Sequence, residues 1–164
     1  MAEKYLRDPR GITTRLPRCL RFLPLVQPFP TLVAGIQDAS GVFTGVLVTW
    51  LCADGTGKAP VDPGRKIFGQ LGGGSVRLAP ASEKLVLCEG VETGLFIAQS
   101  CAELPVWRAL SATNLSHVAI PPSVREVIIA ADADTAGESA AHLAADRFLR
   151  EGRSVRIARP EPGA

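Results

Sequence analysis

Three acidic side chains follow apolar segments of the chain in a pattern that can support metal chemistry. Glu89 comes directly after the apolar residues 85–88. Asp132 and Asp134 come at the end of the apolar residues 127–131 in the same way. Both segments are near-continuously apolar rather than alternating, which is typical of parallel strands buried on both faces. Because open α/β sheets place their sites at the carboxyl ends of such strands, we expect the three carboxylates to lie close together.

A group of carboxylates at adjacent strand ends indicates a bound cation. Like charges held together are costly unless a cation neutralises them, and Mg²⁺ prefers oxygen ligands. The four cysteines include no CxxC pair, and no histidine stands at ligand spacing from them, which argues against a zinc knuckle. The acids therefore predict a Mg²⁺ site that works on phosphate groups.

Two neighbours of Glu89 are expected to support it. Gly90 lets the backbone turn sharply into a helix expected at residues 92–101. Glu92 lies in the first turn of that helix, where a negative charge complements the helix dipole. We favour this structural explanation of Glu92 slightly over a part in the chemistry.

The other two acids precede a helix expected at residues 135–150. Asp134 or Thr135 can cap that helix, and Gly137 lies inside its first turn. Capping uses only one acid, whereas two are present, and Asp132 comes directly out of an apolar strand. Asp132 is therefore the acid for which the sequence offers no purely structural role.

The elements that position these residues alternate along the second half of the chain. Strands separated by helices predict a parallel sheet with right-handed crossovers. We therefore assign residues 81–164 to an α/β domain, an open parallel β-sheet flanked by helices. The expected strands are 85–88, 106–109, 127–131 and 155–158, and the expected helices are 92–101, 114–118 and 135–150.

The first half of the chain has a different pattern. Prolines break any long helix in residues 1–28, where we expect only short helical turns. Strands expected at residues 31–37 and 43–52 are followed by a tight-turn signal at 54–57. Residues 1–80 are therefore predicted to form a smaller lobe that contains an antiparallel β-meander.

The glycine triplet 72–74 allows two interpretations. It resembles a phosphate loop, but a P-loop requires a following helix that carries Lys-Ser/Thr, and none follows here. We favour a flexible turn that leads into a strand at residues 75–78.

Charge is divided unevenly between the two halves. Residues 1–80 hold ten Lys/Arg and five Asp/Glu, a net charge of +5, and residues 81–164 hold eight and eleven, a net charge of −3. A basic lobe beside an acidic lobe suits a polyanion held next to a cation-loaded site. Asymmetry of this size is also common in solvated surfaces.

Composition bounds the class of protein. The chain of 164 residues is 46% apolar and 21% charged, which fits one compact domain, or one domain with a smaller lobe, and argues against disorder. No segment resembles a signal peptide, and no apolar run has the length of a membrane span, so we expect no membrane partner. A reducing cytoplasm is the expected location.

The acids and glycines together resemble a known family. The order Glu89-Gly90, then Asp132-x-Asp134-x-x-Gly137, in consecutive β/α units is similar to the Toprim domain. That domain is shared by bacterial-type primases, by type IA and type II topoisomerases and by several nucleases and recombination proteins. The resemblance covers about residues 84–159 and is strongest to primase and primase–helicase proteins of phages and mobile elements.

The first half resembles the same group of primases. The resemblance rests on Tyr5-Leu6, on Arg10-Gly11-Ile12 and on the segment from Asp54 to Pro60. In primases a basic lobe precedes the Toprim lobe and the nucleic acid lies between them, which agrees with the charge division. Primases usually carry a zinc-binding domain before this region and often a helicase module after it; neither is in this sequence, so we expect either a fragment or a minimal stand-alone protein.

The resemblance implies a role for each acid. Asp132 and Asp134 would hold Mg²⁺ or Mn²⁺, with Glu89 as a further ligand or as the general acid/base. The metal would bind phosphate oxygens and stabilise charge on the attacking and leaving oxygens. Primases usually have an Asp close behind the first Glu-Gly, and here Glu92 would take that place.

Three cations of the basic lobe are candidates for the other half of the site. Lys58, Arg65 and Lys66 would contact template phosphates or the incoming triphosphate. For each of them alone a solvated surface charge is the favoured explanation, and their proximity in the sequence is what favours binding.

The resemblance implies a primase-type nucleotidyltransferase that joins ribo- or deoxynucleotides on a single-stranded DNA template. Its substrates would be nucleoside triphosphates, and a replicative helicase is a further candidate partner. One alternative is a nuclease that hydrolyses phosphodiester bonds with the same acids. Another is a non-catalytic nucleic-acid-binding module. Strand passage is disfavoured because the single tyrosine, Tyr5, lies in the entry segment rather than on a separate domain.

Overall fold

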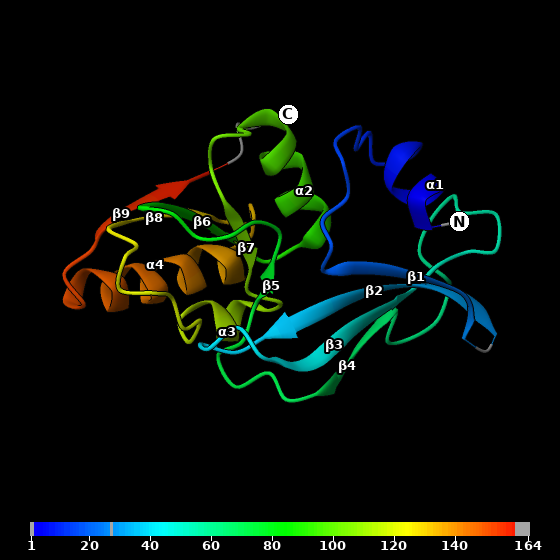
Figure 1. Cartoon of the computed structure of the whole chain (residues 1–164), viewed down its shortest axis with the longest axis horizontal. Coiled ribbons are helices and arrows are strands. Elements are labelled where there is room, and N and C mark those ends of the chain that lie inside the picture. The colour runs from blue at the N-terminus through cyan, green and yellow to red at the C-terminus, as the bar shows by residue number, and fades with distance from the viewer. Residues whose placement is uncertain (1, 27, 160–164) are drawn as a thin grey trace.

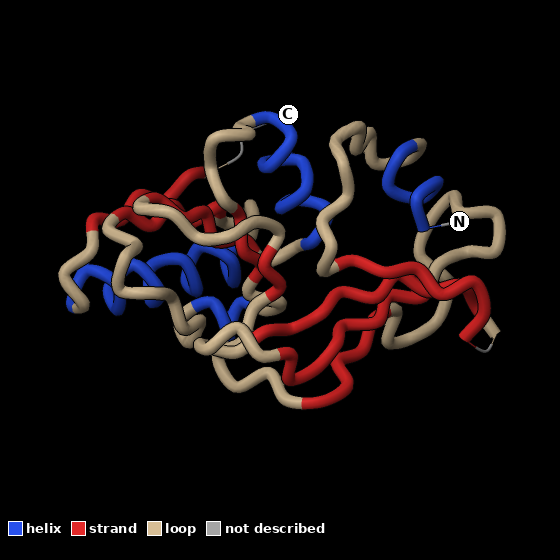
Figure 2. The backbone as a smooth tube through the Cα atoms, in the orientation of Figure 1, coloured by secondary structure: helices blue, strands red, loops and turns tan. Residues whose placement is uncertain are grey.

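The structure, a computed structural model, describes residues 2–26 and 28–159. It contains two β-sheets, each with helices beside it (Figures 1 and 2). In chain order the elements are α1 (Ala2–Arg7), β1 (Leu20–Val26), β2 (Phe29–Gln37), β3 (Phe43–Trp50), β4 (Arg65–Gly69), β5 (Val76–Arg77), β6 (Lys84–Cys88), α2 (Val91–Ser100), β7 (Val106–Arg108), α3 (Ala112–Leu115), β8 (Glu126–Ala130), α4 (Thr135–Arg150) and β9 (Ser154–Ala158).

The first sheet is an antiparallel meander in the order β1-β2-β3-β4. Strands β2 and β3 are the two strands expected from the sequence. Strand β1 was not expected, because the prolines of this region predicted only short helical turns. That expectation is wrong for β1, which is an edge strand whose pairing with β2 shifts register between Leu23 and Val26. Pro24 lies at this irregularity, and proline, which has no N–H to donate, is confined to sheet edges and bulges.

The second sheet confirms the α/β architecture expected for the second half of the chain. Its order is β5-β7-β6-β8-β9, in which β7, β6, β8 and β9 run parallel and β5 is an antiparallel edge strand. The near-continuous apolar strands are covered on both faces. Leu85 and Leu87 pack in a cluster with Ala141 and Phe148 of α4.

The opposite face of this sheet is covered by α2. Val86 and Cys88 alternate with the α4-facing residues of β6 and pack in a cluster with Ile97 of α2. Figure 1 shows α2 and α4 on opposite sides of the sheet. Cys88 is fully buried, as the sequence predicted, and burial raises the pKa of its thiol to about 12.

The two sheets share part of their core. One apolar cluster contains Tyr5 and Ile12 from the first segment, Leu47 from β3, and Val91 and Leu95 from α2. The expected lobe boundary at residue 80 falls in the connection between β5 and β6. Packing across this connection therefore fixes the orientation of α2, and with it the end of β6, relative to the meander. In the part of the chain that the structure describes, no helix is long and apolar enough to cross a membrane.

Candidate active site

The three acids follow the carboxyl ends of two neighbouring strands of the second sheet. Cys88 of β6 pairs with Ala130 of β8 in parallel register, so Glu89 and the segment that leads to Asp132 emerge side by side. Burial raises the pKa of Glu89, and the negative charges of Asp132 and Asp134 raise it further. The structure therefore places the three carboxylates that the sequence singled out at the same end of the sheet, within electrostatic influence of Glu89.

The acids differ in what else they do. Asp134 is the N-cap of α4, and its carboxylate accepts a hydrogen bond of 2.7 Å from the backbone N–H of Gly137. Asp132 is half-buried, and Glu89 lies under the influence of both aspartates. The capping role that the sequence left open between Asp134 and Thr135 belongs to Asp134, which has a second carboxylate oxygen for other contacts.

The site fits a divalent cation in its chemistry. Among residues 2–26 and 28–159, no three His, Cys, Asp or Glu side chains form a group that could hold a metal ion as they stand. The donors at the strand ends are all carboxylate oxygens, which suit Mg²⁺ or Mn²⁺. Burial is the first cause of the raised pKa of Glu89, and the negative charges of Asp132 and Asp134, which a cation would compensate, raise it further.

The two glycines expected to support the acids do so in different ways. At Gly137 a Cβ atom would lie 2.8 Å from the backbone oxygen of Asp132, so only glycine lets the first turn of α4 approach that acid. Gly90 has φ −85° and ψ 145°, which other residues also adopt, so the expectation that it serves by a special backbone turn is wrong. At Gly90 space is the constraint, because a Cβ would lie 3.0 Å from Oγ1 of Thr93.

Glu92 connects the two halves of the chain. Its Oε1 accepts a hydrogen bond of 2.7 Å from the hydroxyl of Tyr5 and forms an ion pair of 3.2 Å with Nζ of Lys58. Burial alone would raise the pKa of Glu92, but the Tyr5 hydrogen bond and the charge of Lys58 outweigh it and lower that pKa. The slight preference for a helix-dipole role missed these partners, which lie far away in sequence.

The C-terminal end of α2 is hydrogen-bonded to the same N-terminal segment of the chain. Oε1 of Gln99 accepts hydrogen bonds of 2.9 Å from the hydroxyl of Thr13 and 3.1 Å from the N–H of Thr14. The Gln99 amide donates to the carbonyl of Gly11 at 3.2 Å. Helix α2, which follows Glu89, is therefore held by the N-terminal segment at both of its ends.

Two of the three predicted cations lie near the acids. Lys58 pairs with Glu92, and the positive charge of Arg65 lowers the pKa of Glu89 against the effect of burial. Lys66 follows Arg65 on β4, and successive strand side chains point to opposite faces. Its Nζ lies 5.3 Å from the centre of the Phe68 ring instead. The structure brings Lys58 and Arg65 to the acid site but not Lys66.

Arg108 is a site residue that the sequence reasoning missed. It ends β7, is only 1% exposed, and donates a hydrogen bond from Nε to the backbone carbonyl of Glu89. Its Nη1 is buried and has no hydrogen-bond partner among the described residues. Burial, followed by the charge of Arg65, lowers the pKa of Arg108 to about 10, so its side chain is still charged at neutral pH. The sequence did contain a signal for Arg108, because it is a charged residue inside a strand that was expected to be buried.

Tyr5 and Arg10 extend the cationic side of the site. Nε of Arg10 donates to the Tyr5 hydroxyl at 3.2 Å, and its guanidinium lies 5.3 Å from the centre of the Tyr5 ring. Burial, followed by the hydrogen bond to Glu92, raises the pKa of Tyr5 to about 12. The segment of Tyr5 to Ile12 thus contributes contacts to α2.

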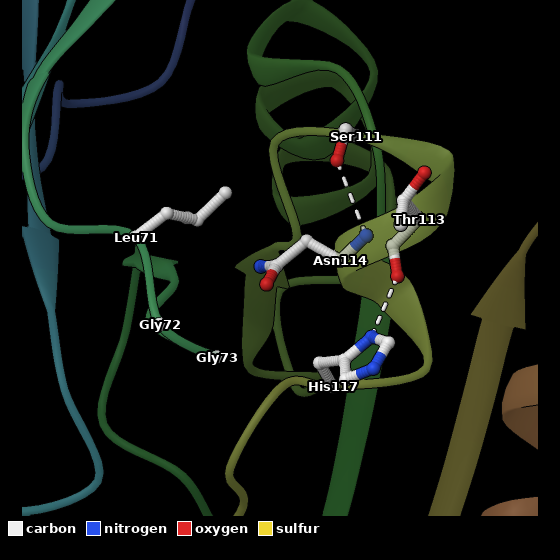
Figure 3. Close-up of a pocket in the computed structure, with 7 residues that line it drawn as sticks. All are labelled: Leu71, Gly72, Gly73, Ser111, Thr113, Asn114 and His117. Carbon is white, nitrogen blue, oxygen red and sulfur yellow. Dashed lines mark hydrogen bonds between the residues drawn. The ribbon is translucent and has the colours of Figure 1, made fainter.

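The glycine triplet forms a turn that leads into β5, as favoured from the sequence. Gly72 and Gly73 have φ of +43° and +77°, and a Cβ on Gly73 would lie 2.6 Å from the carbonyl oxygen of His117. Figure 3 shows the cavity of about 430 Å³ between this turn and α3. Nδ2 of Asn114 donates to the carbonyls of Gly74 at 2.9 Å and Ala109 at 2.7 Å, so Asn114 ties the turn to the sheet.

Comparison with protein families divides the chain in the connection between β5 and β6. Residues 84–164 match the family described as Toprim domain. Residues 1–78 match a family described as a domain of unknown function (DUF7146). No curated protein matches the chain.

Solved structures share the fold. The primase fragment of the bacteriophage T7 primase-helicase is 21% identical with a TM-score of 0.61, over 83% of this chain and 56% of that one. The E. coli primase catalytic core is 17% identical with a TM-score of 0.56, over 99% and 53%. A chain in the structure of the bacteriophage T7 lagging-strand DNA polymerase, interacting with primase domains of two gp4 subunits bound to an RNA/DNA hybrid and dTTP, is 18% identical with a TM-score of 0.61, over 87% and 71%. The chain spans about half the length of the first two.

Proposed function

Residues 84–164 form a Toprim domain, in a chain with the fold of primase catalytic cores, and we propose that this chain joins nucleotides on a single-stranded DNA template. The alternatives raised by the sequence, a nuclease and a binding module, would use the same surface. The proposal is supported by the T7 complex, in which primase domains and the lagging-strand DNA polymerase are assembled with an RNA/DNA hybrid and dTTP.

One observation carries the proposal: acids of the second half and cations of the first half meet at one site. Glu92 forms an ion pair with Lys58, and the positive charge of Arg65 lowers the pKa of Glu89. A triphosphate has negative charge that needs cations, and its transfer needs acids that bind metal and move protons. A site with both kinds of group is suited to nucleotidyl transfer from a triphosphate.

We assign the acids separate parts. Asp132 and Asp134 would hold Mg²⁺ or Mn²⁺, which when bound supplies positive charge to phosphate oxygens. Glu89, with its raised pKa, accepts the proton of the hydroxyl that attacks the α-phosphorus of the triphosphate, and pyrophosphate leaves as the α–β phosphoanhydride bond breaks. A base with a pKa closer to neutrality transfers protons more effectively. Asp134 keeps its capping hydrogen bond throughout and positions the start of α4.

We assign the cations to the substrate. Lys58 and Arg65 contact the phosphates of the incoming nucleotide, and buried Arg108 fixes the carbonyl of Glu89 and thereby the turn that presents its carboxylate. Lys66 faces away from the acids and has no part in this step. The T7 relative comes from a primase-helicase protein, which supports a replicative helicase as a partner.

A primer-synthesis assay tests the proposal. The full chain is incubated with single-stranded DNA, nucleoside triphosphates and Mg²⁺ or Mn²⁺, and labelled products are resolved by length. We expect extended products from the wild type and none from Glu89→Gln or Asp132→Asn. Exposed Glu103, outside the site, supplies the control Glu103→Gln, which should retain activity.

Three results would contradict the assignment. Full synthesis by Glu89→Gln and Asp132→Asn would remove the acids from the reaction. Shortening of labelled DNA by the wild type without nucleotides, abolished by the same substitutions, would assign the site to a nuclease instead. Metal-independent binding of DNA without either reaction would assign a binding module.

A further inference from the structure

A second cavity lies near the amino-terminal ends of the parallel strands, whereas the acids follow their carboxyl ends. It has a volume of about 760 Å³ and is lined by residues that include Arg18, Arg21, Phe43, Arg77, Trp107 and Ser123. Its walls also include residues 79–81, which lead into the start of β6, and Pro121, which precedes the start of β8. The acids follow the other ends of these strands, so the cavity is a separate surface from the candidate active site.

A stacked arginine forms one wall of this cavity. Arg77 of β5 lies opposite Trp107 of β7 in antiparallel register, and its guanidinium is 4.1 Å from the centre of the indole ring. Arg77 also donates from Nη2 to the carbonyl of Asp38. Nε1 of Trp107 donates to the carbonyl of Ala79 at 2.9 Å, which fixes the ring beneath the guanidinium. The cation is thus held in position before any ligand binds.

The rest of the lining adds positive charge and an open aromatic surface. Arg18 and Arg21 are both exposed. Phe43 is 63% exposed, although its ring lies against Gly35, so one side of the ring is supported and the other is open. The described residues of the lining carry three arginines and no carboxylate. Nearby Asp38 directs its carboxylate to the N–H groups of Ser40 and Val42 at 2.9 and 3.0 Å.

We propose that this cavity binds single-stranded nucleic acid, with Arg18, Arg21 and Arg77 on phosphates and a base stacked on Phe43. Arginines that follow a backbone beside an exposed aromatic ring are the combination that binds single strands without sequence preference. A single phosphate would occupy little of 760 Å³, whereas a nucleotide with its neighbours uses both the charges and the ring.

The inference shares with the proposed function only the class of ligand. It needs neither the acids nor a metal nor a reaction, because it concerns binding alone. A strand held here would lie outside the reacting centre and would keep the chain on its template, or would hold the strand that leaves it.

Binding of a short fluorescein-labelled oligothymidylate to the full chain, measured by anisotropy in EDTA without nucleotides, tests the inference. We expect the double variant Arg18→Gln/Arg21→Gln to bind several-fold more weakly. For a single strand, each arginine removed from a phosphate should make the slope of log K against log salt shallower by about 0.7. Arg15→Gln is the matched control, since Arg15 is an exposed cation of the same segment that does not line the cavity, and it should bind as the wild type does.

A second variant separates stacking from charge. Phe43→Leu keeps an apolar group over Gly35 and removes the ring, so it should weaken binding of the oligonucleotide and leave binding of inorganic polyphosphate unchanged. Equal affinity and equal salt slope in the wild type and the double arginine variant would overturn the inference. So would equal weakening in Arg15→Gln, which would indicate diffuse charge rather than this cavity. Neither result depends on the primer-synthesis assay. Failure of the proposed function can therefore be distinguished from failure of this inference.

Discussion

The hydroxyl of Tyr5 donates a hydrogen bond of 2.7 Å to the carboxylate of Glu92, 87 positions later in the chain. The same oxygen of Glu92 pairs with Lys58 at 3.2 Å. One half-buried carboxylate is thus shared by the entry segment, the meander and the first turn of α2. The position of the Glu89 turn depends on this junction, because α2 begins two residues after Glu89.

Stability should depend on the Tyr5–Glu92 pair. Hydrogen bonds to charged groups contribute about 1.5–3 kcal/mol. We expect Tyr5→Phe and Glu92→Gln each to lower the free energy of unfolding, with a coupling energy of about 1–2 kcal/mol in the double-mutant cycle. Urea denaturation followed by circular dichroism measures all four proteins. Strict additivity of the two single changes would contradict a direct bond in solution.

The single tyrosine makes its titration directly measurable. The pKa of Tyr5 is raised from 10.0 to about 12, with burial as the first cause and the Glu92 hydrogen bond as the second. The neutral phenol is therefore favoured in the folded state, so its contribution to stability is complete below pH 10 and is lost as pH rises toward 12. Ultraviolet difference spectroscopy should give a midpoint well above that of the urea-unfolded chain.

Two variants should shift the midpoint of the Tyr5 titration in opposite directions. Glu92→Gln removes a charge that raises the pKa of Tyr5, so the midpoint should fall toward that of the unfolded chain. Arg10→Gln removes a charge that lowers it, so the midpoint should rise. Shifts in the same direction in both variants would show that unfolding, rather than local electrostatics, sets the midpoint.

Arg108 should matter for activity more than for stability. Arg108→Met loses the hydrogen bond to the Glu89 carbonyl, but it also removes a desolvated charge whose Nη1 has no hydrogen-bond partner among the described residues, and these two effects on stability oppose each other. Arg108 lowers the pKa of Glu89, so Arg108→Met should raise that pKa, and the acid limb of the pH–rate profile should move to higher pH. Exposed Arg125 supplies the control Arg125→Gln, with an unchanged profile. If the acid limb of Arg108→Met stays at the wild-type pH, then Arg108 does not set the pKa of Glu89 in the reaction.

The parallel sheet and its acids were predictable because the information is local. The helix expected at residues 135–150 has those bounds in α4, and the last expected strand differs from β9 by one residue at its start. Each rests on a continuous apolar run or a helical pattern with a cap at its end. The acids were found because Glu89 and Asp132 directly follow such runs, and topology alone brings those ends together.

The contacts between the halves were not predictable in the same way. The partners of Glu92 lie 87 and 34 positions earlier, and no local pattern couples them. Arg65 and Lys66 were treated alike because β4 was not recognised as a strand, and strand alternation is what separates them. Arg108 was read as part of an apolar strand. Its burial depends on tertiary contacts, such as the packing of α2 against β7, that no local pattern shows.

Gly137 should be irreplaceable even by alanine. In a helix, alanine is favoured over glycine by about 1 kcal/mol. Here a Cβ would lie 2.8 Å from the carbonyl oxygen and 3.1 Å from the Cβ of Asp132, so the helix start or the acid must shift. Such overpacking costs about 1–3 kcal/mol, which outweighs the helix preference. We therefore expect Gly137→Ala to lower the urea midpoint and to lose primer synthesis.

Gly57 provides the matched control for this substitution. A Cβ there meets no atom within 4 Å, and its φ lies outside the left-handed region, so Gly57→Ala should leave the urea midpoint unchanged or raise it slightly. A stabilised Gly137→Ala variant with wild-type synthesis would show that α4 can move away from Asp132 without consequence. The close approach of Gly137 to Asp132 would then have no part in placing that acid.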